Sequence, residues 1–434
     1  MFSIWLLLRV REITGKSSLP DLGTHLYGKW SIYLINFLIA FAQLGFPIIF
    51  FIVFGDVAKG LILEIDRNAS SFWTSRLFIQ VSLAIVMLYL ILKKEIHQLK
   101  YAGFALLGMI GVFILLLFLH YLISNPEPHP TEDLIETQIN IEFFASIPTM
   151  TSSYSFHPSL FTSFASLKHK TTGNGLKAGW SAIIVAFIAY SVIPLLGFGL
   201  FGANVNSNLL KNLSGDSRFL PIILQILFLI IAIVHIPIIF FIGKEAVLII
   251  FDEATRGSYS NKNSKITKDQ EDIENEEGQE LPQIQESKED EIEEEHQSNG
   301  QMHQPKDEEI QNVSRTLNSE NKKVIKAPNP KEYLNMNPVY YYSVTMICYI
   351  LVVTLSIVVG DVTVFFGIIG STAGSWLIIS GPASFYILAV HKHNVPMDTW
   401  YLKLSYIISY VYCAIGLAMV FGLNACVIIN AFRK

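Results

Sequence analysis

Apolar residues run through most of this chain in long stretches that short polar loops separate. An α-helix rises 1.5 Å per residue, so about 20 apolar residues are needed to cross the roughly 30 Å hydrocarbon core of a bilayer. The pattern predicts an all-α, polytopic membrane protein. Nine stretches come near spanning length, at residues 30–55, 73–92, 101–123, 143–165, 179–201, 219–242, 339–359, 363–390 and 402–430.

The stretch at residues 141–167 has the length of a span but a polar middle. Pro148 and Pro158 each remove a helix hydrogen bond, and the hydroxyl side chains between them compete for backbone groups. In lipid such a break survives only inside protein or beside a water-filled cavity. Transporters place their substrate sites at broken helices of this kind. A proline-kinked packing helix or an amphipathic re-entrant segment would give the same pattern, so both alternatives stay open.

Composition supports the membrane prediction, because 51% of the 434 residues are hydrophobic and 15% are charged. The protein surface is expected to contact a lipid bilayer, and no nucleic-acid partner is expected. Cys348, Cys413 and Cys426 lie in apolar runs and form no CxxC pair, so they indicate small buried side chains rather than disulfides or a metal site.

Lysine and arginine are unevenly divided between alternate loops, and this bias predicts orientation. With residues 1–29 inside, the richer loops at residues 93–100, 168–177 and 243–338 are inside too. The loops with fewer lysine and arginine residues then lie outside, as does the C-terminus. The glycosylation sequences Asn68-Ala69-Ser70 and Asn212-Leu213-Ser214 both lie in outside loops, which agrees with this orientation.

The formal net charge of −5 hides an acidic segment, because residues 269–309 hold 17 Asp and Glu against 2 Lys. Residues 254–333 have almost no aromatics and no apolar period, which predicts a disordered acidic cytosolic loop. It would divide the transmembrane domain into residues 1–253 and 334–434. The loop is either a solvated spacer or the docking arm for a cytosolic partner.

Small residues are repeated in the stretch at residues 363–390. Gly367, Gly370, Gly374 and Gly381 would let the backbone of a neighbouring helix approach closely. Pro382 is expected to kink this helix.

Four motifs occur in an order that one family shares, at residues 18–28, 147–167, 190–210 and 364–386. On these motifs the chain resembles the amino acid/auxin permease family, which includes the sodium-coupled neutral and the vacuolar amino acid transporters. The likeness runs from about residue 6 to residue 421. The chain departs from the family pattern at Phe156, where the family often has Cys, and at Ser166, where it often has Glu.

The resemblance implies a secondary transporter of amino acids, not an enzyme, in a vacuolar, lysosomal or plasma membrane. It implies the LeuT-like (APC-type) inverted-repeat bundle, with its first and sixth helices broken at the substrate site. Matched to that fold, the chain lacks the first helix and most of the second. The sequence is therefore an incomplete copy of a longer protein or a chain that has lost transport. A non-transporting membrane sensor or scaffold is the alternative function.

One wall of the substrate site is expected at the hydroxyls and main chain of the broken stretch, from Thr149, Thr151, Ser152, Ser153 and Tyr154. Gln43 would line another wall, although a glutamine that packs between helices fits equally well.

The coupling ion is expected to be H⁺ or Na⁺, with no cofactor or bound metal otherwise. By resemblance, residues 219–243 correspond to the helix that supplies a threonine hydroxyl to sodium in sodium-coupled relatives, yet they contain no Ser or Thr. They carry His235 before Pro237 instead. Histidine titrates near physiological pH, so His235 is the candidate for a proton relay. A packed neutral histidine is the alternative.

Overall fold

The computed structural model describes residues 1–94, 99–126, 141–206, 208–214, 219–257, 332–359 and 362–433. All regular elements in these ranges are helical. The α-helices are α1 (Phe2–Thr14), α2 (Leu19–Tyr27), α3 (Ser31–Ile65), α4 (Arg76–Leu92), α5 (Leu99–Ser124), α7 (Ile141–Ser153), α8 (Leu160–Ala165), α9 (Thr172–Phe201), α10 (Leu209–Leu213), α11 (Phe219–Arg256), α14 (Pro338–Val358), α15 (Val362–Ile369), α16 (Gly381–Lys392), α17 (Trp400–Ala418) and α18 (Asn424–Arg433).

The chain divides into two compact units, residues 1–251 with 337–434 and residues 252–336. Except at its ends, the predicted acidic loop at residues 254–333 lies outside the described residues. In the second unit the structure describes the last turn of α11 and a short 3₁₀ helix, Glu332–Asn335. The site discussed below belongs to the first unit.

Each of the nine predicted stretches corresponds to helix. Seven helices in the described part of the chain are long and apolar enough to cross a membrane, and Arg76–Leu92 is a shorter apolar helix. The remaining stretch, residues 143–165, is interrupted between α7 and α8. The structure thus agrees with the prediction of a polytopic all-helical membrane protein.

Hydropathy underestimates the length of the longest helices. The apolar run of α3 was predicted to end at residue 55, but the helix continues to Ile65 through the charged residues Asp56, Lys59 and Glu64. At 1.5 Å per residue, its 35 residues span about 50 Å, which exceeds the roughly 30 Å hydrocarbon core. Helical hydrogen bonding does not require apolar side chains, so the helix extends into the polar region.

Four helices, α3, α4, α11 and α14, share one apolar core. Phe51, Met87, Phe240 and Tyr349 are buried together there, and the Tyr349 hydroxyl donates to the Ala84 carbonyl at 2.8 Å. A second core joins α1, α2, α8, α15 and α16. These two cores form the frame of the first unit.

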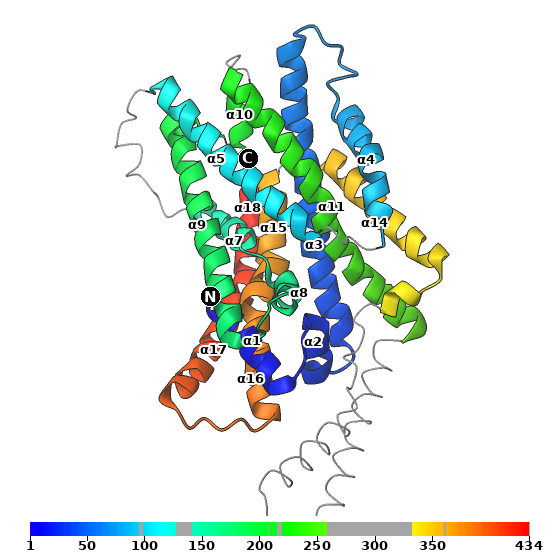
Figure 1. Ribbon diagram of the computed structural model, residues 1–434, viewed down its shortest axis with the longest axis vertical. Helices are drawn as coiled ribbons and strands as arrows, with labels where there is room; N and C mark the ends of the chain where they lie inside the picture. The colour runs from blue at the N-terminus through cyan, green and yellow to red at the C-terminus, as the bar shows by residue number, and fades with distance from the viewer. Residues whose placement is uncertain are drawn as a thin grey trace, which may run out of the picture. The chain divides into compact units, whose positions relative to one another are not determined.

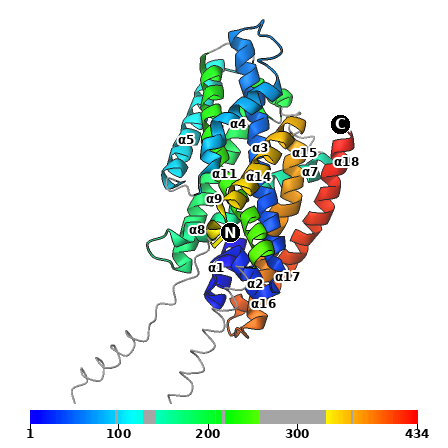
Figure 2. The ribbon, with the colours of Figure 1, turned by 90° about the vertical axis from the view of Figure 1, so that its right-hand side faces the viewer.

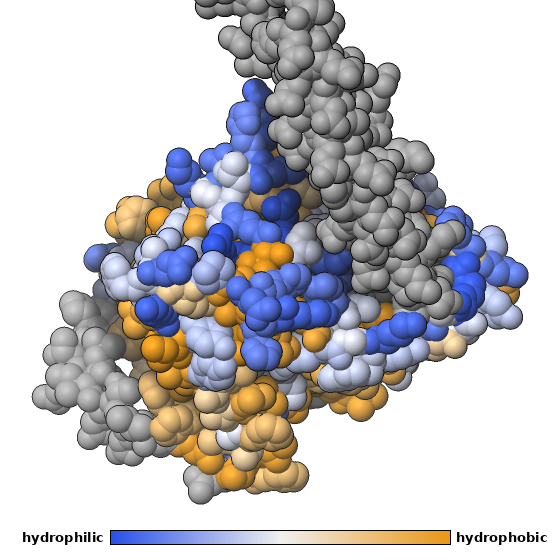
Figure 3. All heavy atoms as spheres, turned by 90° about the horizontal axis from the view of Figure 1, so that it is seen from below, coloured by the Kyte–Doolittle hydropathy of each residue, from blue (hydrophilic) through white to orange (hydrophobic). Residues whose placement is uncertain are grey.

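The connections fall at two ends of the first unit. The end of α3 and helix α10 lie at one end, whereas α2 and the end of α16 lie at the other (Figure 1). The distribution of lysine and arginine assigns the segments at these two ends to opposite sides of the membrane. Seen from below, hydrophilic residues gather on one end face, with hydrophobic residues flanking them (Figure 3).

Peripheral helices carry the apolar exposed surface. Helices α5 and α17–α18 lie at opposite edges of the first unit (Figure 2), and many apolar side chains of α5, α9 and α17 are exposed. Large apolar patches of this kind are unfavourable in water, so these faces suit contact with lipid.

Candidate functional site

The helix that begins at Ile141 is interrupted after Ser153. Residues 154–156 form a turn, a 3₁₀ helix covers His157–Ser159, and α8 begins at Leu160. The hydroxyls of Thr151 and Ser153 donate to the carbonyls of Ile147 and Thr149, at 2.9 and 3.0 Å. Such bonds weaken the end of a helix. The break predicted from the sequence is present, with Pro148 inside α7 and Pro158 beyond the turn.

The exposed end of α7 has a partner from α9. The Tyr190 hydroxyl donates to the Ser153 carbonyl at 2.9 Å, and the Tyr190 ring meets the Tyr154 ring edge-on at 5.3 Å between centroids. This contact satisfies one carbonyl that the interrupted helix leaves without an intrahelical donor.

The glycine-rich helix packs directly on α7. A Cβ atom added to Gly370 would overlap the Pro148 carbonyl oxygen and the Ser152 hydroxyl, and one added to Gly374 would contact Ser152 at 3.6 Å. The prediction that these glycines allow close backbone approach is confirmed. The same region is wound as two π-helical segments, Gly370–Gly374 and Trp376–Ser380, and π-bulges often mark functional sites in helices.

Unpaired polar atoms collect around this junction. The hydroxyl oxygens of Thr149, Ser152 and Ser155 and the Nδ1 atom of His157 are buried without a hydrogen-bond partner, as is the hydroxyl of Ser380 in the second π-helical segment. The 3₁₀ helix that begins with His157 contacts that segment. Since more than nine in ten buried polar groups in proteins are paired, this concentration indicates a site for a polar ligand.

The structure separates the five residues predicted for the pocket wall into two kinds. Thr149 and Ser152 keep unpaired buried hydroxyls, whereas Thr151 and Ser153 bond back to their own helix and Tyr154 packs on Tyr190. Ser155, His157 and Ser380 were not predicted as site residues. The run of hydroxyls and the His-Pro pair were visible signals for the first two, but Ser380 joins the site only through tertiary packing.

Gln43 is buried in α3, and both α3 and α7 pack against α15. Its backbone lies against Gly243 of α11, because a Cβ atom there would meet the Gln43 carbonyl carbon at 3.0 Å. The role of Gln43 at the pocket stays a prediction.

His235 lies in the frame rather than at the break. Its half-buried ring stacks on Phe50 of α3, with 4.9 Å between centroids and 26° between planes. Its neighbour Ile236 is buried in the core that α3, α4, α11 and α14 share. This environment suits a packed histidine.

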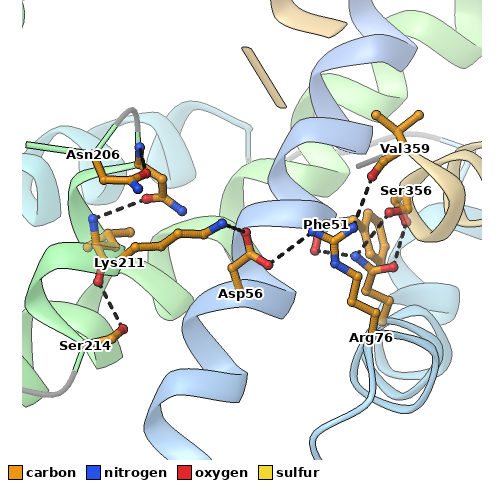
Figure 4. Close-up of polar contacts among 11 residues, drawn as sticks. Phe51, Asp56, Arg76, Asn206, Lys211, Ser214, Ser356 and Val359 are labelled. Atoms are coloured by element: carbon orange, nitrogen blue, oxygen red, sulfur yellow. Dashed lines mark hydrogen bonds and ion pairs between the residues drawn. The ribbon is translucent and has the colours of Figure 1, made fainter. Parts of the chain in front are cut away.

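An ionic cluster lies at the end of the unit that holds α10 (Figure 4). Asp56 of α3 pairs with Lys211 of α10 at 2.9 Å and with Arg76 of α4 at 3.4 Å. Arg76 also donates to the Val359 carbonyl, just beyond α14, at 3.2 Å. One carboxylate thus connects several elements at this end.

A histidine pair lies at the opposite end of the unit. The Nε2 atoms of His25 and His393 are 2.9 Å apart, and Lys392 donates to the His25 carbonyl at 2.6 Å. Burial, together with the positive charges of Lys392, His393 and Lys16, lowers the pKa of His25 to about 4. In the described ranges no three His, Cys, Asp or Glu side chains gather as a metal-binding group.

These features define a class: a multi-pass helical membrane protein with an interrupted helix that buries unpaired polar groups. A sequence model described as "Transmembrane amino acid transporter protein" matches residues 1–429. The chain therefore belongs to the transmembrane amino acid transporter family.

Individual relatives are distant. The chain is 27% identical to sodium-coupled neutral amino acid transporter 7 of Mus musculus over 232 residues, 51% of this chain and 49% of that protein. It is 22% identical to amino acid transporter AVT6E of Arabidopsis thaliana over 278 residues, 60% and 57% of the two chains. It is 23% identical to vacuolar amino acid transporter 6 of Saccharomyces cerevisiae over 221 residues, 48% of each. The chain spans about half the length of the relatives it matches.

Proposed function

We propose that this protein moves amino acids across a membrane as a secondary transporter, by alternating access. The observation that carries the proposal is the group of buried, unpaired polar atoms from Thr149 to His157, at a helix break. An amino acid brings an ammonium and a carboxylate group, which both need partners once water is removed. Unwound backbone and hydroxyls beside a helix end supply such partners.

The C-terminal end of α7 suits the ammonium group of the substrate. Helix dipoles place partial negative charge at this end, and residues 150–153 carry its last carbonyls. Thr149 and Ser152 add unpaired hydroxyl oxygens. In this proposal Thr151, Ser153 and Tyr154 shape the end of α7, and Gln43 faces the substrate from α3.

The fold that we propose is the LeuT-like inverted repeat, in which α7 and α8 form the broken sixth helix. Family membership and the names of the relatives, which are all amino acid transporters, support it. The same names support a vacuolar, lysosomal or plasma membrane. No observation favours a sensor or scaffold, and the docking arm proposed for it lies outside the described residues.

Proton coupling is part of the proposal. Sodium prefers oxygen ligands, and the part of α11 at residues 219–243 offers no hydroxyl side chain. Histidine is the side chain whose ordinary pKa allows protonation in the physiological range. Uptake is therefore expected to follow a pH gradient and to be unaffected by replacing sodium with choline.

The test is flux into liposomes that contain the purified protein. Each of the common amino acids is supplied with a radioactive label, and protein-free liposomes are the control. Saturable uptake of at least one amino acid, with competition by the unlabelled compound, is the expected result. The absence of uptake and exchange for every amino acid, from protein shown to be folded, would contradict the proposed function.

A further inference from the structure

His157 lies at the first position after the turn that interrupts the helix. Its side chain is 2% exposed, and its Nε2 atom lies 2.9 Å from the hydroxyl oxygen of Ser3 in α1, a residue 154 positions away. The other ring nitrogen, Nδ1, is buried without a partner. One nitrogen therefore anchors the ring, and the other is left for a further ligand.

The two ring nitrogens have different tasks in a neutral imidazole, because one donates a hydrogen bond and the other accepts. A serine hydroxyl can take either role, so Ser3 holds the ring in both the neutral and the protonated state. After protonation both nitrogens donate. Nε2 would then donate to Ser3, and Nδ1 would require a new acceptor.

Among the described residues, no Asp or Glu carboxylate acts on the His157 ring as an acceptor for that N–H. The phenol of Tyr412 in α17 hydrogen-bonds Ser3 and is neutral near pH 7. On the remaining sides lie the Phe156 ring, at 5.0 Å between centroids, and the second π-helical segment, in which Ser380 is neutral.

A buried cation without a counter-ion is strongly unfavourable. The imidazolium form of His157 thus needs an anion that none of the described residues supplies. An amino acid has one, its carboxylate, and the unpaired hydroxyls of Ser152 and Ser155 precede His157 in the same interrupted stretch.

We propose that His157, positioned by Ser3, binds the coupling proton, and that the protonated ring binds the carboxylate of the amino acid substrate. The inference rests on the proposed function and replaces His235 as the coupling residue. A proton from the donor side adds to the free ring nitrogen, the carboxylate binds to the resulting N–H, and both leave on the other side. No covalent bond other than N–H forms or breaks.

Thermodynamic linkage between proton binding and substrate binding predicts how pH changes the affinity for substrate. Because the substrate favours the protonated ring, the proton must favour substrate binding by the same factor. The substrate concentration for half-maximal uptake should therefore fall as the pH on the donor side falls.

Three variants test the assignment in proteoliposomes. His157→Gln keeps a polar side chain that cannot titrate, His235→Gln is the matched control in the frame, and Ser3→Ala removes the positioning hydroxyl. Three quantities are measured for each: uptake driven by an acidic donor side, exchange of labelled for unlabelled substrate at equal pH, and substrate-induced proton entry with a pH-sensitive dye.

We expect His157→Gln to lose pH-driven accumulation and proton entry by about tenfold or more, and to need a higher substrate concentration for half-maximal exchange, because the ring also binds the carboxylate. His235→Gln should retain all three activities. Ser3→Ala should shift the pH of half-maximal uptake downward by about one unit, because the imidazolium loses an acceptor. This shift keeps the proposal testable if His157→Gln does not fold.

Different results separate the two proposals. Proton entry that persists in His157→Gln, or that is lost in His235→Gln, would overturn the role of His157. Uptake by the unaltered protein that follows sodium and ignores pH would do the same, while leaving amino acid transport intact. A lack of uptake and exchange in the unaltered protein would instead remove the proposed function itself.

Discussion

The ammonium nitrogen of Lys211 lies 2.9 Å from Oδ2 of Asp56, whose side chain is only 14% exposed. The second oxygen of the same carboxylate lies 3.4 Å from Arg76. Asp56 belongs to α3, Arg76 begins α4 and Lys211 lies in α10. The short helix between α9 and α11 is therefore fixed to the frame by an ion pair (Figure 4).

Replacing this carboxylate should destabilise the protein. Asp56→Asn leaves Arg76 and Lys211, which are 33% and 48% exposed, without their counter-ion, and we expect a loss of about 1 kcal/mol in the free energy of unfolding. Lys211→Ala should cost less than about 1 kcal/mol, because Lys211 is 48% exposed. Thermal unfolding in detergent measures both, with the exposed Lys59→Ala on the same helix as control. Equal stability of Asp56→Asn and the unaltered protein would contradict this role.

The contact between Gly370 and α7 gives a steric prediction. Gly370→Ala places a methyl group on the Pro148 carbonyl and the Ser152 hydroxyl, so we expect a destabilisation of about 1–3 kcal/mol and a severe loss of transport. Gly111→Ala in α5 is the matched control, because a Cβ atom there meets nothing within 4 Å. Thermal unfolding and flux are compared for the two variants. A fully active Gly370→Ala protein would show that α7 and the π-helical segment are not in close contact.

Lys244 caps the C-terminal end of α4. This buried lysine of α11 donates to the carbonyls of Ile91 and Lys93, at 2.8 and 2.7 Å. A cation at a helix C-terminus also interacts favourably with the helix dipole. Lys244→Met keeps much of the apolar stem but should cost about 1–3 kcal/mol. Faster amide hydrogen exchange at the end of α4 is expected, and the exposed Lys177→Met is the control. Unchanged exchange would argue against this capping.

The pair of His25 and His393 predicts an acid-sensitive contact. A histidine with an ordinary pKa near 6.5 takes up a proton in the unfolded chain, whereas the pKa of His25 in the folded protein is lowered to about 4. Between these values the unfolded state binds more protons, so stability should fall as the pH drops from about 6.5 to about 4. His25→Gln should lose less stability over this window than the unaltered protein. Melting temperatures at pH 7.5, 6.5, 5.5 and 4.5 measure the difference, with the exposed His169→Gln as control. Identical pH profiles for His25→Gln and the unaltered protein would contradict this prediction.

Much of the helical arrangement could be predicted from the sequence, because membrane spans are set by local apolar length. The break near Pro158 and the close packing of Gly370 follow from residue chemistry that needs no knowledge of distant partners. The length of α3 could not be predicted in this way, because its last ten residues carry charges and continue as helix.

The site residues also differ in how far the local sequence predicts their role. The hydroxyl run of Thr149–Ser155 was visible, but the sequence does not show which hydroxyls bond back to α7 and which stay unpaired. That distinction separates Thr151 and Ser153 from Thr149 and Ser152. The pairing of His157 with Ser3 joins residues 154 positions apart, and the resemblance to sodium-coupled relatives drew attention to His235 instead. Tertiary contacts, not local pattern, identify the histidine at the break.

The central claim is that the interrupted end of α7 binds the transported amino acid. Labelled amino acid uptake into proteoliposomes, compared between the unaltered protein and Ser152→Leu, tests it most directly. Ser152 is 3% exposed and unpaired, and the exposed Ser181→Leu on α9 serves as the control. We predict saturable uptake by the unaltered protein and Ser181→Leu, and none by folded Ser152→Leu. Undiminished uptake by Ser152→Leu would contradict the placement of the site.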